Sequence, residues 1–264
     1  MLVRHVRSDM NDTTESPIQA LDTGIELLET LGELNGAGVS AIADEVGRPK
    51  STVHRHLKTL ENRGYVLKDG TEYYVGLKTL RLGANALNRH LVYPVTKSVV
   101  NSLVEETGES AAVAVEESGQ AVYLYYNRTD HAVKTDARLG IRLYLHCTGT
   151  GKAILAHMSD EQIDRIIDQH GLPRRTEHTI TDRDELDAEL ERVRREGVAF
   201  DDEERLDGMR GVATPILNQE TGDLLGALTV AGPTHRVHGD WFREDIPELL
   251  QRATKMVEVN LTYR

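Results

Sequence analysis

Apolar residues in the first part of the chain follow a helical period. From residue 17 they recur three and four positions apart, at Ile18, Leu21, Ile25, Leu28 and Leu31. This spacing predicts an amphipathic helix that ends at the Asn-Gly pair 35–36. The pattern then predicts a short helix over 40–46, a tight turn at 47–49, a helix over 50–63 and a β-hairpin over 65–75 with an Asp-Gly turn. This order of elements is that of a winged helix-turn-helix.

The rest of the chain predicts an α+β domain. Helical spacing continues from residue 77 to 108, and Pro94 is expected to separate two helices. Further helices are predicted over 151–157, 160–169, 182–195 and 242–261. From residue 111 the period changes to two, which predicts strands at 111–116, 121–127, 133–137, 198–200, 212–217 and 224–231. A mostly antiparallel sheet flanked by helices is the expected architecture.

These elements predict four segments. Residues 1–16 are polar without a period and are expected to form a disordered arm, and residues 1–9 need not belong to the native protein. The winged helix-turn-helix is expected over 17–77, a linker helix over 78–93 and the second domain over 94–264. The linker carries more apolar residues than a solvated helix needs, which indicates a contact between copies of the chain.

Composition and charge restrict the class of protein. No apolar run approaches the ~20 residues of a membrane-spanning helix, and no signal peptide is apparent. The single cysteine, Cys147, excludes an intrachain disulfide, so we expect a cytoplasmic protein. The net charge of -12 argues against nucleic acid. However, lysine is scarce and acid abundant, as on the surfaces of proteins from salt-loving organisms, so the acidity is also explained by the solvent.

Positive charge concentrates locally in the third predicted helix. Residues 48–63 contain Arg48, Lys50, Arg55, Lys58 and Arg63 against the single acid Glu61. With Val53, Leu57 and Leu60 facing inward, the polar and basic residues face the opposite side, as on a helix that enters the major groove. A hydrated basic helix of a small bundle is the alternative. The candidate DNA-binding residues are Lys50, Ser51, Thr52, His54, Arg55 and Lys58, with Lys68 and Tyr73 of the hairpin as phosphate contacts.

A glycine-rich turn at residues 146–153 is the second candidate site. It lacks the glycine and hydroxyl positions of a phosphate-binding loop and has too few glycines for a dinucleotide fingerprint. Backbone N–H groups at the start of a helix can hold a carboxylate, although the glycines would equally serve a tight turn alone. His146, Cys147 and Asp201 do not make a convincing zinc set. A nucleophilic Cys147 would need a nearby base, and its neighbour His146 would point to the opposite face of a strand. We therefore predict no metal, no cofactor and no catalytic residues.

Three stretches resemble the IclR family of transcription regulators, and the similarity extends over about residues 17–261. They are residues 48–66, residues 146–156 and residues 197–233. The family signature falls on Gly197, Asp201, Glu204 and Gly211. This resemblance implies a winged helix-turn-helix, a linker helix and a GAF-like effector-binding domain, with small organic, aromatic or sugar-derived acids as effectors. The chain departs from the family at position 211, where Cys, Ser or Ala is usual, and at Thr229 and Ala231, where the family carries serines.

The resemblance gives the second site its candidate residues. Asp201 is expected to face the pocket, Glu204 to support the adjoining loop and Arg210 to supply a counter-charge. The full set of candidates is Val113, Leu143, Leu145, Thr148, Gly149, Gly151, Lys152, Asp201, Arg210, Gly211, Thr229 and Ala231.

The hypothesis is a sequence-specific regulator whose affinity for its double-stranded DNA operator changes when a small effector binds. It would act as a dimer or a dimer of dimers, without enzymatic activity. Two alternatives stay open. One is a metabolic enzyme with a catalytic C-terminal domain, which would need a nucleophile, a base and an oxyanion site. The other is a DNA-binding regulator that responds to no ligand.

Overall fold

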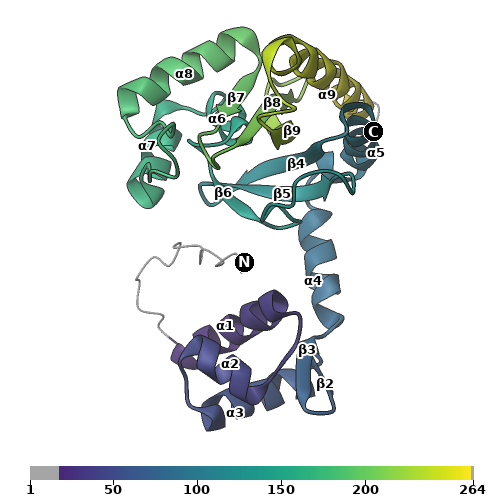
Figure 1. Cartoon of the computed structure of the whole chain (residues 1–264), viewed down its shortest axis with the longest axis vertical. Helices are drawn as coiled ribbons and strands as arrows, with labels where there is room; N and C mark the ends of the chain where they lie inside the picture. The colour runs from purple at the N-terminus through teal and green to yellow at the C-terminus, as the bar shows by residue number, and fades with distance from the viewer. Residues whose placement is uncertain (1–17, 263–264) are drawn as a thin grey trace. The chain divides into compact units, whose positions relative to one another are not determined.

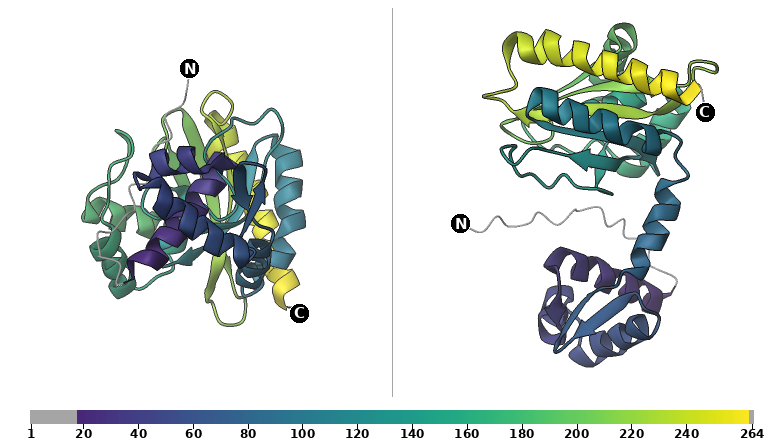
Figure 2. Two further views of the ribbon diagram at one scale, coloured as in Figure 1. Left: turned by 90° about the horizontal axis from the view of Figure 1, so that it is seen from below. Right: turned by 90° about the vertical axis from the view of Figure 1, so that its right-hand side faces the viewer.

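The computed structural model describes residues 18–262, and the chain divides into two compact units between Ala86 and Leu87 (Figures 1 and 2). The arm expected at residues 1–16 lies outside the described residues. None of the helices in the described part of the chain is long and apolar enough to cross a membrane.

The N-terminal unit is the predicted winged helix-turn-helix. It contains three helices, α1 (Gln19–Leu34), α2 (Val39–Val46) and α3 (Lys50–Asn62), followed by the hairpin β2 (Val66–Asp69) and β3 (Glu72–Val75). A third strand, β1 (Ala37–Gly38), which the sequence pattern did not predict, pairs with β3 and gives the order β1-β3-β2.

The turn between α2 and α3 depends on one glycine. Helix α2 ends at Gly47, whose φ of 63° is in the left-handed region, and the Gly47 N–H donates to the carbonyl of Ala43. The chain then reverses direction through Pro49, where α3 begins. The apolar sides of the three helices meet in one core that includes Leu27, Leu31, Ile42, Val53 and Leu57. This core fixes which side of α3 is left for solvent.

Two helices follow the hairpin. Helix α4 (Lys78–Leu87) is followed by α5 (Val92–Thr107) after a short break. Pro94 does not lie between the helices as predicted. It lies in the first turn of α5, where a missing N–H costs nothing because that donor has no partner inside the helix.

The C-terminal unit is built on an antiparallel sheet in the order β6-β5-β4-β9-β8-β7. The strands are β4 (Ser110–Glu117), β5 (Gln120–Asn127), β6 (Arg142–Tyr144), β7 (Ala199–Asp202), β8 (Met209–Leu217) and β9 (Leu224–Pro233). The strand predicted at 133–137 is wrong, because residues 128–141 form neither helix nor strand. The short edge strand β6 lies just beyond this segment.

Helices cover both faces of this sheet (Figures 1 and 2). One face packs against α5 and α9, and the other packs against α6, α7 and α8. The π-helical turn η1 carries Trp241 directly before α9. The bounds of these helices are α6 (Gly149–Leu155), α7 (Asp160–His170), α8 (Arg183–Glu196), η1 (Trp241–Asp245) and α9 (Ile246–Thr262).

Strand β4 shows how the two layers share the sheet. Val113 and Val115 belong to the core under α5 and α9, whereas Ala112 and Ala114 belong to the core that includes α6 and α8. Because successive residues of a strand point to opposite faces, both sets are buried. Small residues on the second face leave room for the hollow described below.

Candidate functional site

The exposed side of α3 is the candidate DNA interface. Val53 and Leu57 are fully buried, and the side chains on the opposite face are exposed. Most of the predicted contacts therefore lie at the surface as expected: Thr52 is partly exposed, and the exposed ones are Lys50, Ser51, His54, Arg55, Lys58 and Lys68.

Not every cation near α3 is available for DNA. The Arg48 Nε lies 2.8 Å from a carboxylate oxygen of Glu26 on α1, and the Lys58 Nζ lies 3.0 Å from Glu61. Within residues 18–262, Lys50 and Arg55 form no ion pair. These two side chains therefore have charge that a phosphate or a guanine edge can use.

Tyr73 is a correction to the predicted interface. It lies on β3, the middle strand of its small sheet, and is only 2% exposed because it packs into the core of the unit. The Lys68 ammonium lies 5.5 Å from the centre of the Tyr73 ring. Tyr73 therefore supports the hairpin, and of the two hairpin residues only Lys68 is exposed to reach phosphate.

A hollow in the C-terminal unit is the candidate effector pocket. It lies among β4, β5, β8 and β9, the turn before α6 and the loop after β7. The empty space in it, counted together with adjoining open solvent, amounts to about 570 Å³. Seven of the predicted residues line it: Thr148, Gly149, Asp201, Arg210, Gly211, Thr229 and Ala231.

The other five predicted residues lie elsewhere. Val113 is fully buried on the far face of β4, under α5 and α9. Leu143 and Leu145 pack into the layer of α6 and α8. Gly151 contacts the backbone of Leu145, and Lys152 is 1% exposed in an ion cluster beneath the pocket. These positions support the pocket but are not among the residues that line it.

Several lining residues were not predicted. Tyr123 and Tyr126 of β5 stack with ring centroids 6.4 Å apart and give the hollow an aromatic wall. Arg205 lies next to the signature residue Glu204, which was the one sequence signal that could have identified it. The remaining unpredicted residues are Ser110, Ala111, Ala112, Thr135, Ala137, Thr150, Leu206 and Met209.

Two features of the turn before α6 fix the start of this helix. The Thr148 Oγ1 caps the helix by accepting a hydrogen bond of 2.9 Å from the Gly151 N–H. The glycine-rich turn had suggested that backbone N–H groups here could bind a carboxylate, but this N–H is already used by the cap. A Cβ at Gly151 would lie 2.1 Å from the Leu145 carbonyl oxygen, so the glycine is needed for a close approach of two backbone segments.

Asp201 faces the pocket, as predicted. Its Oδ1 accepts hydrogen bonds from the N–H groups of Glu204 at 2.8 Å and Arg205 at 3.3 Å. Burial of the carboxyl group, reinforced by the charge of Glu204, raises the pKa of Asp201 to about 7. At neutral pH, Asp201 is therefore present in both forms, and its protonated form can donate to a ligand oxygen.

This raised pKa predicts a pH-dependent stability. The folded chain retains a proton that the unfolded chain loses at a lower pH, so the Asp201 contribution is largest in acid and is lost as the pH rises towards 7. Relative to Asp201→Asn, the free energy of unfolding of the wild type should fall by roughly 2 kcal/mol between about pH 5 and pH 8. Urea unfolding followed by the fluorescence of Trp241 measures this difference. The control Asp207→Asn removes an exposed carboxyl from the same loop, and an equal pH effect in the control would contradict the assignment.

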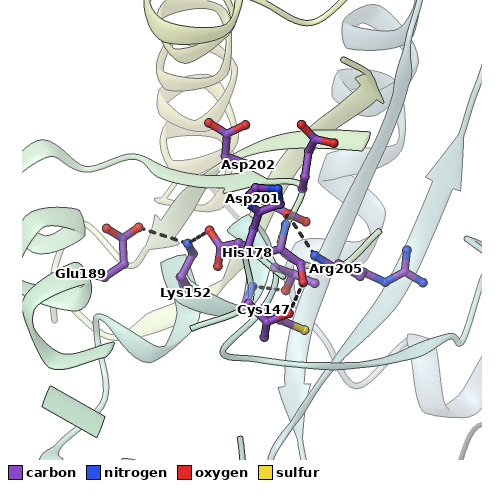
Figure 3. A network of polar contacts seen from close by, with 12 residues as sticks. Cys147, Lys152, His178, Glu189, Asp201, Asp202 and Arg205 are labelled. Atoms are coloured by element: carbon purple, nitrogen blue, oxygen red, sulfur yellow. Dashed lines mark hydrogen bonds and ion pairs between the residues drawn. The ribbon is translucent and has the colours of Figure 1, made fainter. Parts of the chain in front are cut away.

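Beneath the pocket lies a buried ion cluster (Figure 3). The Lys152 Nζ contacts the Oε1 of Glu204 and lies 3.2 Å from a carboxylate oxygen of Glu189, which also pairs with Arg192 at 2.8 Å. The Glu204 backbone carbonyl accepts a hydrogen bond of 2.7 Å from Thr179. The cluster thus joins α6, α8 and the loop after β7, which agrees with the supporting role predicted for Glu204.

Arg210 is not available as a counter-charge for a ligand, and Cys147 is not suited to act as a nucleophile. The Arg210 Nε lies 2.6 Å from Asp202, and another nitrogen of its guanidinium donates to the Val237 carbonyl, so its charge is already used. Cys147 is 1% exposed, and burial raises the pKa of its thiol to about 12. A thiol in this state is a poor nucleophile. In residues 18–262, no group of three or more His, Cys, Asp or Glu side chains is arranged to hold a metal ion.

Comparison with known proteins identifies the two domains that carry these sites. The model of the IclR helix-turn-helix domain matches residues 20–70, and that of the bacterial transcriptional regulator IclR C-terminal domain matches residues 84–258. The chain belongs to the IclR family. As a member of this family, it combines a DNA-binding helix-turn-helix domain with a C-terminal effector domain, as transcription regulators of the family do.

Characterised relatives cover most of the chain. It is 30% identical over 251 residues to the transcriptional repressor IclR of Escherichia coli, which covers 93% of this chain and 90% of the relative. It is 32% identical over 222 residues to the regulator BhcR of Paracoccus denitrificans, covering 83% of this chain and 79% of that protein. Both relatives are transcription regulators.

Solved structures share the fold of this IclR-family chain. IclR of Thermotoga maritima superposes with a TM-score of 0.78 at 24% identity, covering 92% of this chain and 98% of that one. An IclR homologue from Microbacterium hydrocarbonoxydans, solved in complex with 4-hydroxybenzoate, gives a TM-score of 0.79 at 23% identity, covering 93% and 100%.

Proposed function

We propose that the protein binds its operator through the exposed face of α3. Its affinity for the operator changes when a small carboxylic acid binds in the C-terminal hollow. The observation that carries this proposal is the exposed face of α3, where Lys50 and Arg55 form no ion pair within residues 18–262. A helix with this pattern at its N-terminal half suits major-groove contact. DNA binding would take place in the cytoplasm.

The chemistry of the hollow supports a carboxylate with a partly apolar body. Tyr123 and Tyr126 offer aromatic surface, while Asp201 and Arg205 offer polar groups. Pockets of this composition hold small ligands by apolar burial and orient them by a few polar contacts. The 4-hydroxybenzoate in the related structure is a ligand of this kind. Gly211 and Ala231 contribute no polar side-chain atom to the lining.

Self-association is part of this proposal. Leu21 and Ile25 on α1 are 61% and 48% exposed, and Leu77 and Leu80 at α4 are 81% and 66% exposed. Apolar surface of this extent on two helices of one unit indicates a contact with a second copy. Two copies would present two α3 helices to successive major grooves, and the paired contacts would offset the acidity of the chain in DNA binding.

An enzyme with a catalytic C-terminal domain is the alternative to effector binding. The residues that line the hollow include no His or Cys, and the buried Cys147 thiol lies outside the lining. We propose instead that the ligand is bound and released unchanged. Recovery of a chemically altered ligand after incubation with the protein would argue for the enzyme.

Arg55→Ala tests the DNA interface. The variant should weaken specific binding by ~1–3 kcal/mol, because one guanidinium contact to a base edge is lost while the buried face of α3 is unchanged. The measurement is a mobility shift on the DNA upstream of the protein's own gene, with random DNA as competitor. Arg165→Ala is the matched control, since it removes an exposed arginine from α7 in the other unit.

Two results would contradict the proposal. If wild-type protein shows no preference over random DNA at moderate salt, it is not a sequence-specific regulator. If Arg55→Ala binds as the wild type does, α3 does not face the DNA as described.

A further inference from the structure

The segment between β5 and β6 forms one wall of the effector pocket. Residues 128–141 contain no helix or strand, yet Thr135 and Ala137 line the hollow. Asp136, which lies between them, connects this segment to the loop after β7 through an ion pair with Arg205. Its two carboxylate oxygens lie 2.5 and 2.6 Å from one Nη of Arg205.

The two members of this ion pair differ in exposure. The Arg205 side chain is only 16% exposed, whereas that of Asp136 is 54% exposed. If the pair separates, Asp136 can return to water at little cost, because surface ion pairs contribute little. Arg205 cannot, because a largely buried guanidinium without a partner is costly. Arg205 therefore requires a carboxylate but does not require this particular one.

No other cation of the pocket is available in this way. The charged residues among those that line the hollow are Asp201, Arg205 and Arg210. Arg210 is held by Asp202 and by the Val237 carbonyl on a different side. Figure 3 shows the Arg205 side chain directed away from Lys152, so the ion cluster beneath the pocket does not neutralise it directly.

We propose that Arg205 is the residue that selects the effector, that it binds the effector's carboxylate in place of Asp136, and that this exchange releases segment 128–141 from the pocket. This inference rests on the proposed effector function and assigns its specificity. The chain's own Asp136 occupies the anion position until a ligand displaces it. Because the pKa of Asp201 is about 7, this group is only partly ionised at neutral pH and opposes an anionic ligand less than a fully charged carboxylate would.

The exchange predicts a preference for carboxylates over their neutral amides. An amide cannot replace the charge of Asp136, so it should leave the ion pair in place. Removing the internal competitor in Asp136→Asn should strengthen carboxylate binding by about three- to tenfold and leave amide binding unchanged. Asp130→Asn is the matched control, since it removes an exposed carboxylate from the same segment.

The experiment uses the full chain and matched probes. The pairs are 4-hydroxybenzoate and 4-hydroxybenzamide, pyruvate and pyruvamide, and glucuronate and glucuronamide, at constant ionic strength. Thermal shift and calorimetry measure binding, and hydrogen exchange of residues 128–141 measures release of the segment. We expect at least one acid to bind better than its amide, with faster exchange in its complex and in ligand-free Asp136→Asn. Arg205→Met should remove the preference.

The outcomes separate this inference from the proposed function. It is overturned if no acid is preferred over its amide in wild type or in Asp136→Asn, or if Asp136→Asn binds the acids no better than Asp130→Asn. Arg205→Met that folds and keeps the preference would also overturn it. Specific DNA binding by ligand-free protein, measured in parallel, tests the proposed function alone, so either idea can fail while the other stands.

Discussion

Lys152→Met is expected to reduce the free energy of unfolding of the C-terminal unit by about 3–5 kcal/mol. Lys152 is 1% exposed and is the cation shared by Glu189 and Glu204, whose side chains are 17% and 10% exposed. Glu189 retains Arg192, but Glu204 would have no cation. Its Oε2 already has no hydrogen-bond partner among the described residues. A buried carboxylate in this state must stay charged without a partner or take up a proton, and both are unfavourable.

Urea unfolding monitored by Trp241 checks this prediction, because the chain has a single tryptophan and it lies in this unit. Burial already raises the pKa of Glu204 above its ordinary value, and loss of Lys152 should raise it further. The destabilisation should therefore be smaller at about pH 5 than at about pH 8. Lys152→Met/Glu204→Gln should recover part of the loss.

The control for Lys152 is a lysine at the surface. Lys255 on α9 is 62% exposed and lies 3.9 Å from Glu258. Lys255→Met should change the free energy of unfolding by less than about 1 kcal/mol. An equally small effect of Lys152→Met would show that water reaches the cluster and that it does not hold α6, α8 and the loop after β7 together.

Gly151→Ala is expected to destabilise the same unit by about 3 kcal/mol or more. The added methyl group would lie 2.1 Å from the Leu145 carbonyl oxygen and 2.3 Å from the Leu145 Cα. Backbone atoms cannot rotate away as a side chain can, so α6 would have to move. Because α6 begins at the turn that lines the pocket, the same movement should weaken binding of any effector.

Gly149→Ala is the matched control for this effect. Its Cβ would meet the Ala199 carbonyl oxygen at 3.2 Å, a contact that a small shift relieves. Its cost should be clearly lower than that of Gly151→Ala in the same unfolding experiment. Helix propensity favours alanine over glycine, so it cannot account for a loss at either position. Equal costs at both positions would mean that the close approach to Leu145 is not what makes Gly151→Ala costly.

The sequence predicted the architecture well because local signals agreed with one another. In the N-terminal unit, helical spacing, Gly47 and the Asp-Gly turn all indicated the same order of elements, and the structure confirms it. Strand β1 was missed because two residues carry no detectable alternation. Its pairing with β3 makes β3 a central strand. Tyr73 is buried because its side chain packs into the core of the unit, so it does not face DNA.

The pocket was harder to predict for a different reason. Both faces of β4 are covered by helices, so its residues 111–115 are all apolar and the pattern does not show which face lines the hollow. Val113 was assigned to the wrong face, and Ala112 takes its place. The ion pair of Arg205 could not be predicted because its partner, Asp136, lies 69 positions away. Such a pairing depends on the fold and leaves no local pattern.

The buried thiol of Cys147 has a practical consequence. As the chain contains one cysteine and that cysteine is 1% exposed with a pKa of about 12, maleimide reagents should leave the folded protein unlabelled. A single cysteine introduced at an exposed position would then carry a fluorophore or spin label without removal of the native residue. One label per chain is the requirement for testing by energy transfer whether two copies pair on DNA, as proposed above, and whether an effector changes the distance between their labels.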